Sequence, residues 1–165
     1  MERLAGRTIL VTGSTGGLGR AIAHRLAEEG GQIVVTDLDA AACQTLADSL
    51  PGHRHIGRRL DVSSEPEWTD LVTTIANRGS GLDVLINNAA IGSLATVETE
   101  QREAWDRLIA VDQTGVWLGL KHAGALIERS GGGAIVNMSS ILGTGGGLGT
   151  SIAYHAAKGA VRSMT

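Results

Sequence analysis

The chain has 165 residues, of which 42% are hydrophobic and 19% are charged, so it is long enough to bury a core as one soluble domain spanning residues 1–165. A formal net charge of −3 argues against a nucleic-acid partner, and without a polybasic run or a long apolar segment no membrane contact is expected. Cys43 is the single cysteine, which excludes an internal disulfide and favours a reducing cytoplasm.

Short apolar runs alternate with segments of helical spacing along the chain. The apolar runs predict strands at residues 8–12, 33–36, 55–60, 84–87 and 134–138. The helical spacing predicts helices at residues 17–29, 40–49, 65–77 and 100–129, and a last helix that Tyr154 opens. Strands that alternate with helices specify a parallel sheet covered on both faces, so we predict an α/β fold with a doubly wound parallel sheet of about five strands.

The turn between the first predicted strand and the first predicted helix is rich in glycine. It runs from Thr12 to Gly19 and contains four glycines. Glycine permits a tight turn and a close approach of the backbone to a ligand, and the following helix N-terminus offers free N–H groups to a pyrophosphate. We expect the residues that bind a dinucleotide in this turn to be Gly13, Ser14, Gly17, Leu18 and Gly19. The alternative is a flexible loop that binds nothing.

An acidic residue ends the second predicted strand, 18 residues beyond the glycine-rich turn. At this place the carboxylate of Asp37 can accept hydrogen bonds from the adenosine ribose hydroxyls, and it repels a 2′-phosphate. Because neither Lys nor Arg occupies positions 14–16 or 38, we expect NAD rather than NADP. The alternative role, capping the next helix, suits Asp39 better.

Tyr154 and Lys158 are four residues apart in the last predicted helix, so their side chains share one face. An ammonium group beside a phenol favours the phenolate, and such a pair can donate and accept a proton in general acid–base chemistry. Alone, this spacing also occurs by chance on solvated helix faces. Its meaning therefore depends on the motifs that precede it.

Five motifs, in this order along the chain, resemble the classical short-chain dehydrogenases/reductases. They are the glycine-rich turn, Asp61-Val62, the segment 87–90, the run 135–140, and the Tyr154-x-x-x-Lys158 pair. The resemblance covers the whole chain. It implies a Rossmann-type fold and an NAD-dependent oxidoreductase that moves a hydride between a nicotinamide and a secondary alcohol or ketone.

The family resemblance also implies roles for particular residues. Tyr154 would be the general acid/base, Lys158 would hold the nicotinamide ribose hydroxyls, and Ser140 would hydrogen-bond the substrate oxygen. The alternative for Ser140 is a turn or cap at the strand end. The remaining cofactor contacts would be made by Asp61 and Val62 at the adenine, and by Asn88 and Ala89 at the ribose.

One catalytic position departs from the family pattern. Asp112 stands where the family usually has a catalytic Asn. An ionised Asp can only accept hydrogen bonds, so we expect the proton relay to run in an altered form. A carboxylate near Lys158 would hold that lysine protonated, and it would oppose a phenolate nearby.

The resemblance leads us to expect a C-terminally truncated chain, because family members continue through further strands and a segment that covers the substrate. We expect a homo-oligomer for the full-length parent. Two classes of function stay open: the oxidoreductase, and a non-catalytic dinucleotide-binding or interaction module in which truncation and Asp112 have removed turnover. The loop 141–153 has no charged side chain, which favours a neutral, apolar alcohol or ketone as substrate. A steroid, a cyclic alcohol and an acyl thioester all stay open as substrates.

No metal site is expected. His53 and His55 alternate on a predicted strand and could bind a metal ion together. Without further ligands nearby in the sequence, a solvated strand face is the expected environment of these two histidines.

Overall fold

The computed structural model describes residues 2–145 and 149–165. The strands are β1 (Thr8–Thr12), β2 (Gln32–Asp37), β3 (Ile56–Arg59), β4 (Val84–Asn87) and β5 (Ala134–Asn137). The helices are α1 (Gly17–Glu28), α2 (Ala40–Ser49), α3 (Glu65–Asn77), α4 (Arg102–Ile109), α5 (Gly115–Arg129) and α6 (Ile152–Ser163), with a π-helical turn η1 (Ala110–Thr114) and a short 3-10 turn η2 (Ile141–Gly143).

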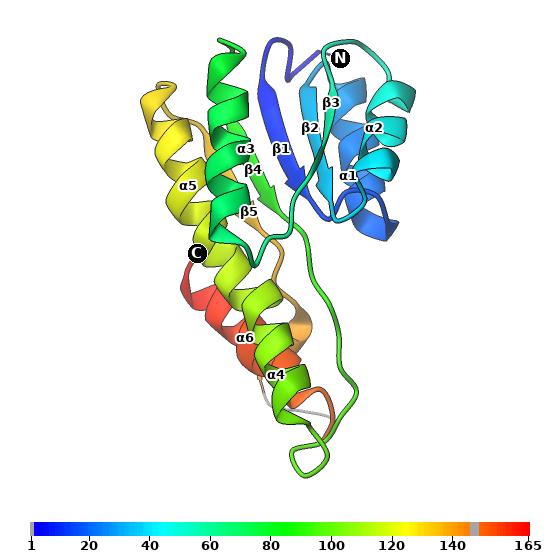
Figure 1. Cartoon of the computed structure of the whole chain (residues 1–165), viewed down its shortest axis with the longest axis vertical. Helices are drawn as coiled ribbons and strands as arrows, with labels where there is room; N and C mark the ends of the chain where they lie inside the picture. Colours follow the sequence, from blue (N-terminus) through cyan, green and yellow to red (C-terminus); the bar gives the residue numbers. More distant parts are fainter. Residues whose placement is uncertain (1, 146–148) are drawn as a thin grey trace.

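The strands form one parallel sheet in the order β3-β2-β1-β4-β5, which confirms the predicted doubly wound fold (Figure 1). In register, Leu10 of β1 lies between Val34 of β2 and Leu85 of β4. The chain first runs from β1 outward to β3 and then crosses to β4 on the other side of β1. The carboxyl ends of β1 and β4 therefore flank the point where the strand order reverses, which is where open α/β sheets bind their ligands.

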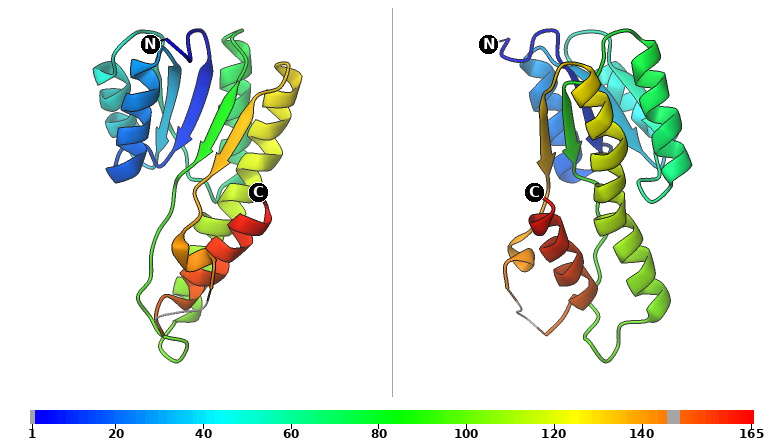
Figure 2. Two further views of the ribbon diagram at one scale, coloured as in Figure 1. Left: turned by 180° about the vertical axis from the view of Figure 1, so that it is seen from behind. Right: turned by 90° about the vertical axis from the view of Figure 1, so that its left-hand side faces the viewer.

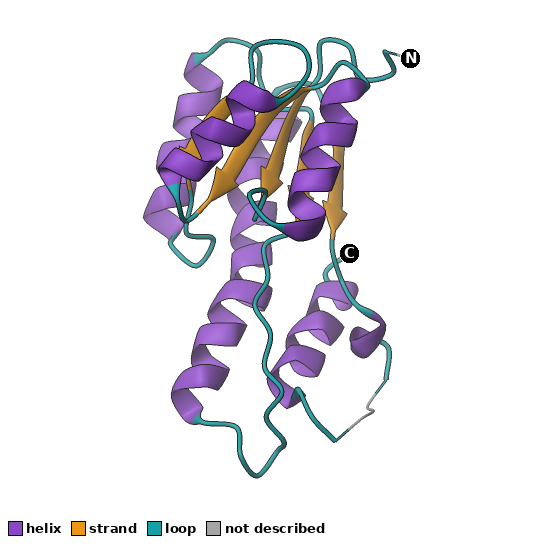
Figure 3. Ribbon diagram, turned by 90° about the vertical axis from the view of Figure 1, so that its right-hand side faces the viewer, coloured by secondary structure: helices purple, strands orange, loops and turns teal. Residues whose placement is uncertain are grey.

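Helices cover both faces of the sheet, as Figure 3 shows. On one face α1 and α2 pack on the side chains of Ile9, Val11 and Val35, and on the other face α3 and α5 pack on Leu10 and Leu85. Because successive side chains of a strand point to opposite faces, a strand buried on both faces must be apolar throughout. This is why the strands could be recognised as continuous apolar runs.

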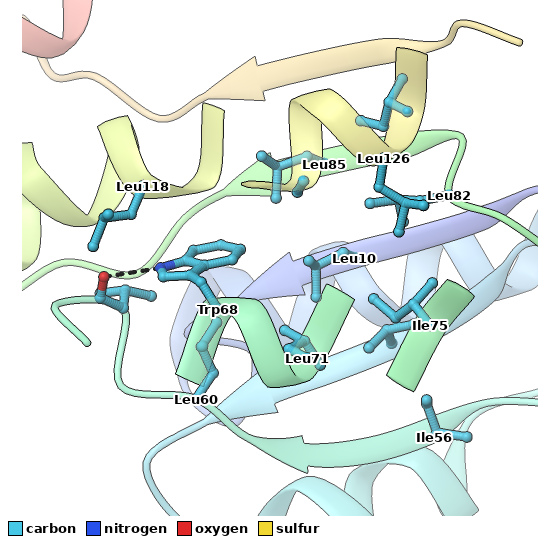
Figure 4. Packing of buried hydrophobic residues seen from close by; sticks show 14 residues of the cluster. Leu10, Ile56, Leu60, Trp68, Leu71, Ile75, Leu82, Leu85, Leu118 and Leu126 are labelled. Carbon is cyan, nitrogen blue, oxygen red and sulfur yellow. Dashed lines mark hydrogen bonds between the residues drawn. The ribbon is translucent and has the colours of Figure 1, made fainter. Parts of the chain in front are cut away.

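Trp68 of α3 is the largest fully buried side chain of the sheet–helix core (Figure 4). Its ring packs among aliphatic side chains from the sheet and from α5, and its Nε1 donates a 2.9 Å hydrogen bond to the carbonyl oxygen of Val62. The indole therefore fills the core and also fixes the backbone of the segment that follows β3.

The long helix predicted at residues 100–129 is interrupted in the structure. It begins at Arg102, because residues 96–100 form a hydrogen-bonded turn, and the π-helical turn η1 separates α4 from α5. Figure 2 shows that α4 extends beyond the sheet and that α6 lies beside it. Helix α6 starts two residues before the predicted Tyr154, because the N–H of Ser151 is held by the carbonyl of Ala95 and its own carbonyl begins the helix.

Candidate functional site

A cleft of about 600 Å³ opens at the carboxyl ends of β1 and β4. It is lined by the turn after β1, the ends of β2, β3 and β4, and one side of the α4–η1 helix. Eight of the residues predicted to bind the cofactor line this cleft: Gly13, Leu18, Gly19, Asp37, Asp61, Val62, Asn88 and Ala89. The structure thus brings side chains from distant parts of the sequence to one ligand-sized cavity at the expected edge of the sheet.

The glycine-rich turn is packed closely against the segment that follows β4. Gly13 has a positive φ of 63°, and a Cβ on it would lie 2.7 Å from the Cα of Ala89. A Cβ on Gly19 would lie 2.1 Å from the carbonyl oxygen of Gly13. The Nδ2 of Asn88 donates to the carbonyl oxygens of Thr12 and Gly13, at 2.9 and 3.0 Å. The Asn88 side chain, expected to line the ribose side, therefore braces the turn from within the protein.

Two residues predicted to bind the cofactor in this turn do not line the cleft. Ser14 is fully buried, and its hydroxyl joins β1 to β2 by donating to the Val11 carbonyl at 2.7 Å and accepting from the Thr36 amide at 2.9 Å. Gly17 has a positive φ of 36° and is exposed at the start of α1. Thr15 and Gly16 line the cleft in their place.

Asp37 reaches the cleft with its carboxylate already oriented by the protein. Oδ2 accepts hydrogen bonds from the amide and the hydroxyl of Thr15, at 3.1 and 2.7 Å, and Oδ1 accepts from the amide of Leu38 at 2.8 Å. Asp39 caps α2 instead, accepting from the amides of Ala41 and Ala42. The two neighbouring acids thus have the separate positions that their places in the sequence indicated.

The opposite wall of the cleft comes from the segment after β3 and from the α4–η1 helix. Asp61 closes a turn by accepting from the amide and the hydroxyl of Ser63, at 2.9 and 2.6 Å. Val62 packs against Gly115, where a Cβ would lie 2.9 Å from the valine methyl group. Arg107 also lines the cleft, and sequence analysis did not single it out. Its position follows from the rotation of α4, which no local motif records.

The residues predicted to be catalytic gather where α6 meets the end of β5 and the turn η1. The Nζ of Lys158 lies 5.5 Å from the centre of the Tyr154 ring and donates a 3.1 Å hydrogen bond to the carbonyl of Met138. Ser140 caps the start of η2, and its hydroxyl oxygen accepts a 3.2 Å hydrogen bond from the amide of Leu142. Lys158 is almost fully buried, with 3% of its side chain exposed. Its charge is therefore felt strongly by the groups around it.

Asp112 lies inside the π-helical turn and is completely buried. One carboxylate oxygen, Oδ1, accepts a 2.8 Å hydrogen bond from the amide of Ile91, and the other, Oδ2, lies 3.4 Å from the Nζ of Lys158. Burial raises the pKa of this carboxyl, while the Ile91 amide and the Lys158 ammonium act in the opposite direction. The structure thus buries Asp112 and Lys158 together, with the half-buried ring of Tyr154 next to Lys158.

Among the described residues, no group of three or more His, Cys, Asp or Glu side chains could hold a metal ion. The Nδ1 of His55 accepts a 3.0 Å hydrogen bond from the amide of Ile33, so this ring links β3 to β2 rather than facing solvent as expected. Across residues 2–145 and 149–165, no helix has the length and apolarity to cross a bilayer.

Comparisons with known proteins all point to dehydrogenases. A family model described as short chain dehydrogenase matches residues 7–165. The chain is 36% identical, over 99% of its length, to the 2,5-dichloro-2,5-cyclohexadiene-1,4-diol dehydrogenase LinX of Sphingobium indicum, and 40% identical, over 99% of its length, to the cis-4-hydroxycyclohexanecarboxylate dehydrogenase of Sinomonas cyclohexanicum. It spans 66% of the length of each of these relatives.

A solved structure shares the fold along nearly the whole chain. It is a protein of Sinorhizobium meliloti 1021 assigned to the short-chain alcohol dehydrogenases, and it superposes with a TM-score of 0.92 at 29% identity. The match covers 98% of this chain and 65% of that structure.

Proposed function

The chain belongs to the short-chain dehydrogenase family, and from this premise we propose that it serves an oxidoreductase that transfers a hydride between a nicotinamide cofactor and a secondary alcohol or ketone. The observation that carries the proposal is the joint placement of a nucleotide-sized cleft at the switch point of the sheet and of the Tyr154–Lys158 pair on α6, which packs against the η1 turn that lines the cleft.

The residues of the cleft fit a dinucleotide. At Gly13 and Gly19 the backbone leaves no room for a Cβ, so the turn can stay narrow while its amides face a pyrophosphate at the start of α1. Leu18, Val62 and Ala89 supply apolar walls, Asp61 shapes the segment after β3, and Asn88 braces the turn itself.

We propose NAD rather than NADP as the cofactor. The carboxylate of Asp37 is fixed at the cleft by Thr15 and Leu38, so its charge and its free lone pairs face whatever occupies the adenosine ribose position. A 2′-phosphate would meet this negative charge, whereas ribose hydroxyls would donate to it. Arg107 is the cation of the cleft, and it lies on the α4 wall rather than on the turn or on β2.

The proposed chemistry at the reacting end uses three side chains. The nicotinamide supplies the hydride chemistry when it is bound. The phenolate of Tyr154 would accept the hydroxyl proton in oxidation, and the phenol would donate it to the substrate oxygen in reduction, with Ser140 orienting that oxygen. Lys158, whose ammonium lies near the phenol ring, would stabilise the phenolate and hold the cofactor ribose.

For the substrate we propose a neutral cyclic secondary alcohol or the corresponding ketone. Both named relatives are dehydrogenases whose printed substrates are ring alcohols, which supports a cyclic alcohol; the substrate of the second also carries a carboxylate, so the choice of a neutral compound rests on the uncharged loop. The exposed Leu94 and Ile141 leave apolar surface near α6, in keeping with the uncharged loop 141–153, of which residues 146–148 lie outside the described part. We also propose a cytoplasmic location, because Cys43 is a free, buried thiol. We further propose that the protein has no nucleic-acid partner and that the full-length parent is a homo-oligomer.

The test measures NADH binding and turnover on the same preparation. NADH binding is followed by fluorescence, and oxidation is assayed with NAD and a panel of cyclic secondary alcohols. In the full-length parent, we expect Tyr154→Phe to abolish oxidation of the alcohol. The affinity for NADH should stay within about twofold of the wild type, because only the phenol oxygen is removed. Unchanged turnover in this variant would refute the assigned acid/base. Binding without any turnover by the wild type would favour the non-catalytic module.

A further inference from the structure

Each of the two carboxylate oxygens of Asp112 has a different neighbour: the backbone N–H of Ile91 or the ammonium group of Lys158. Oδ1 accepts from the Ile91 amide at 2.8 Å, and Oδ2 lies within ion-pair distance of the Lys158 ammonium, at 3.4 Å, and makes no hydrogen bond among the described residues. Both side chains are sealed from solvent, with 0% of the Asp112 side chain and 3% of the Lys158 side chain exposed. Water cannot screen this pair, so the interaction between the charges is strong.

An amide could not replace this carboxylate without loss. Asn offers one acceptor oxygen and one NH₂ donor on the same framework. If the oxygen stays with the Ile91 amide, the NH₂ group faces the Lys158 ammonium, and if the side chain is flipped, it faces the Ile91 N–H. Only the carboxylate presents an acceptor oxygen to each neighbour at once. Asp112 is therefore not a passive isostere of the family Asn.

Other titratable groups around the pair lie on the elements packed against η1. On α6 these are Tyr154, one turn before Lys158, and His155, whose Nδ1 contacts the carbonyl of Ser151 at 2.8 Å.

Helices α4 and α5 supply the other titratable groups near η1. On α4, Arg107 is exposed and lines the nucleotide cleft. On α5, Lys121 and His122 both pair with Glu65. Within the described chain, the charged group in ion-pair contact with Asp112 is Lys158.

We propose that Asp112 is a positioning residue, the buried counter-ion that keeps Lys158 charged and seats its Nζ between Oδ2 and the Met138 carbonyl. In the proposed dehydrogenase this would make the net charge of the Asp112–Lys158 pair zero, so Tyr154 would work beside a neutralised pair instead of a free cation. That functional consequence rests on the proposed function. The ion pair itself does not.

The chain allows a direct test, because it contains only two lysines, Lys121 and Lys158. Lysine labelled with ¹³C at Cε gives one NMR signal for each, and its shift reports the charge of the amine as pH is raised. In Asp112→Asn we expect the titration midpoint of Lys158 to fall by at least about one pH unit, since an opposite charge within about 4 Å favours the charged form by that order. The titration midpoint of Lys121, which lies on α5 and pairs with Glu65 of α3, should not change and serves as the internal control.

The neutral variant Asp112→Ser repeats the test with a smaller side chain, in case the Asn variant does not fold. A fall in the Lys158 midpoint with a constant Lys121 midpoint in either folded variant supports the proposal, because a purely structural role for Asp112 would leave both unchanged. A Lys158 midpoint within about 0.3 pH units of the wild type would overturn it. The NMR readout needs neither cofactor nor substrate. If the wild type neither bound NADH nor showed turnover, that result would contradict the proposed function and leave the proposal for Asp112 and Lys158 standing.

Discussion

Replacing Gly19 by Ala should damage the packing of the glycine-rich turn, although alanine is the better helix former. Gly19 lies in the first turn of α1, where Ala would stabilise an isolated helix by about 1 kcal/mol. Its Cβ, however, would lie 2.1 Å from the Gly13 carbonyl oxygen and 2.7 Å from the Asn88 Nδ2. Overpacking costs about 1–3 kcal/mol or more, and loss of the Asn88–Gly13 hydrogen bond costs about 1 kcal/mol. The net expectation is a loss of about 1–3 kcal/mol in unfolding free energy.

Urea unfolding followed by circular dichroism measures that loss, and NADH fluorescence measures the expected drop in affinity of at least about tenfold. Gly16→Ala is the matched control in the same turn, because a Cβ there meets nothing within 4 Å and the backbone is extended at φ −116°. Gly16→Ala should keep its unfolding free energy within about 0.5 kcal/mol of the wild type. If Gly19→Ala is as stable as Gly16→Ala, the close packing of the turn is wrong.

Two further predictions concern stability. Trp68→Phe should lower the unfolding free energy by about 2–4 kcal/mol, because it leaves a cavity and removes the hydrogen bond to the Val62 carbonyl. Urea unfolding measures this loss, and a loss below about 1 kcal/mol would contradict the packing in Figure 4. The hydrogen bond from Arg3 lowers the pKa of Glu29 from 4.5 to about 2, so its carboxylate should stabilise the fold above about pH 4.5 and lose this effect as pH falls toward 2. The stability difference between the wild type and Glu29→Gln should therefore shrink over that range, and a constant difference would refute the assignment.

Most of the fold could be predicted because it depends on local patterns. Strands buried on both faces must be apolar throughout, and glycine at the first turn marks a place where the backbone has no room for a side chain. The strand ends that carry Asp37 and Asp61 then fall at one edge of a parallel sheet as a matter of topology, so their meeting in one cleft also followed from the sequence.

The details that escaped prediction depend on contacts between distant segments. The π-helical turn at Ala110–Thr114 is only five residues long and lies between two helices, so it is too short for the spacing of apolar residues to reveal it. The pairing of Thr15 with Asp37, and the inward turn of the Asn88 amide, are set by how closely two loops approach. The Asp112–Lys158 contact was expected from the family pattern, but its two-oxygen geometry required the structure.

We propose that the cleft at the ends of β1 and β4 binds NAD(H) through the glycine-rich turn and Asp37. Parallel fluorescence titrations of the protein with NADH and with NADPH test it most directly. We predict saturable binding of one NADH per chain, tighter than NADPH by at least about tenfold, or about 1.4 kcal/mol. Absence of NADH binding, or equal or tighter binding of NADPH, would contradict the account.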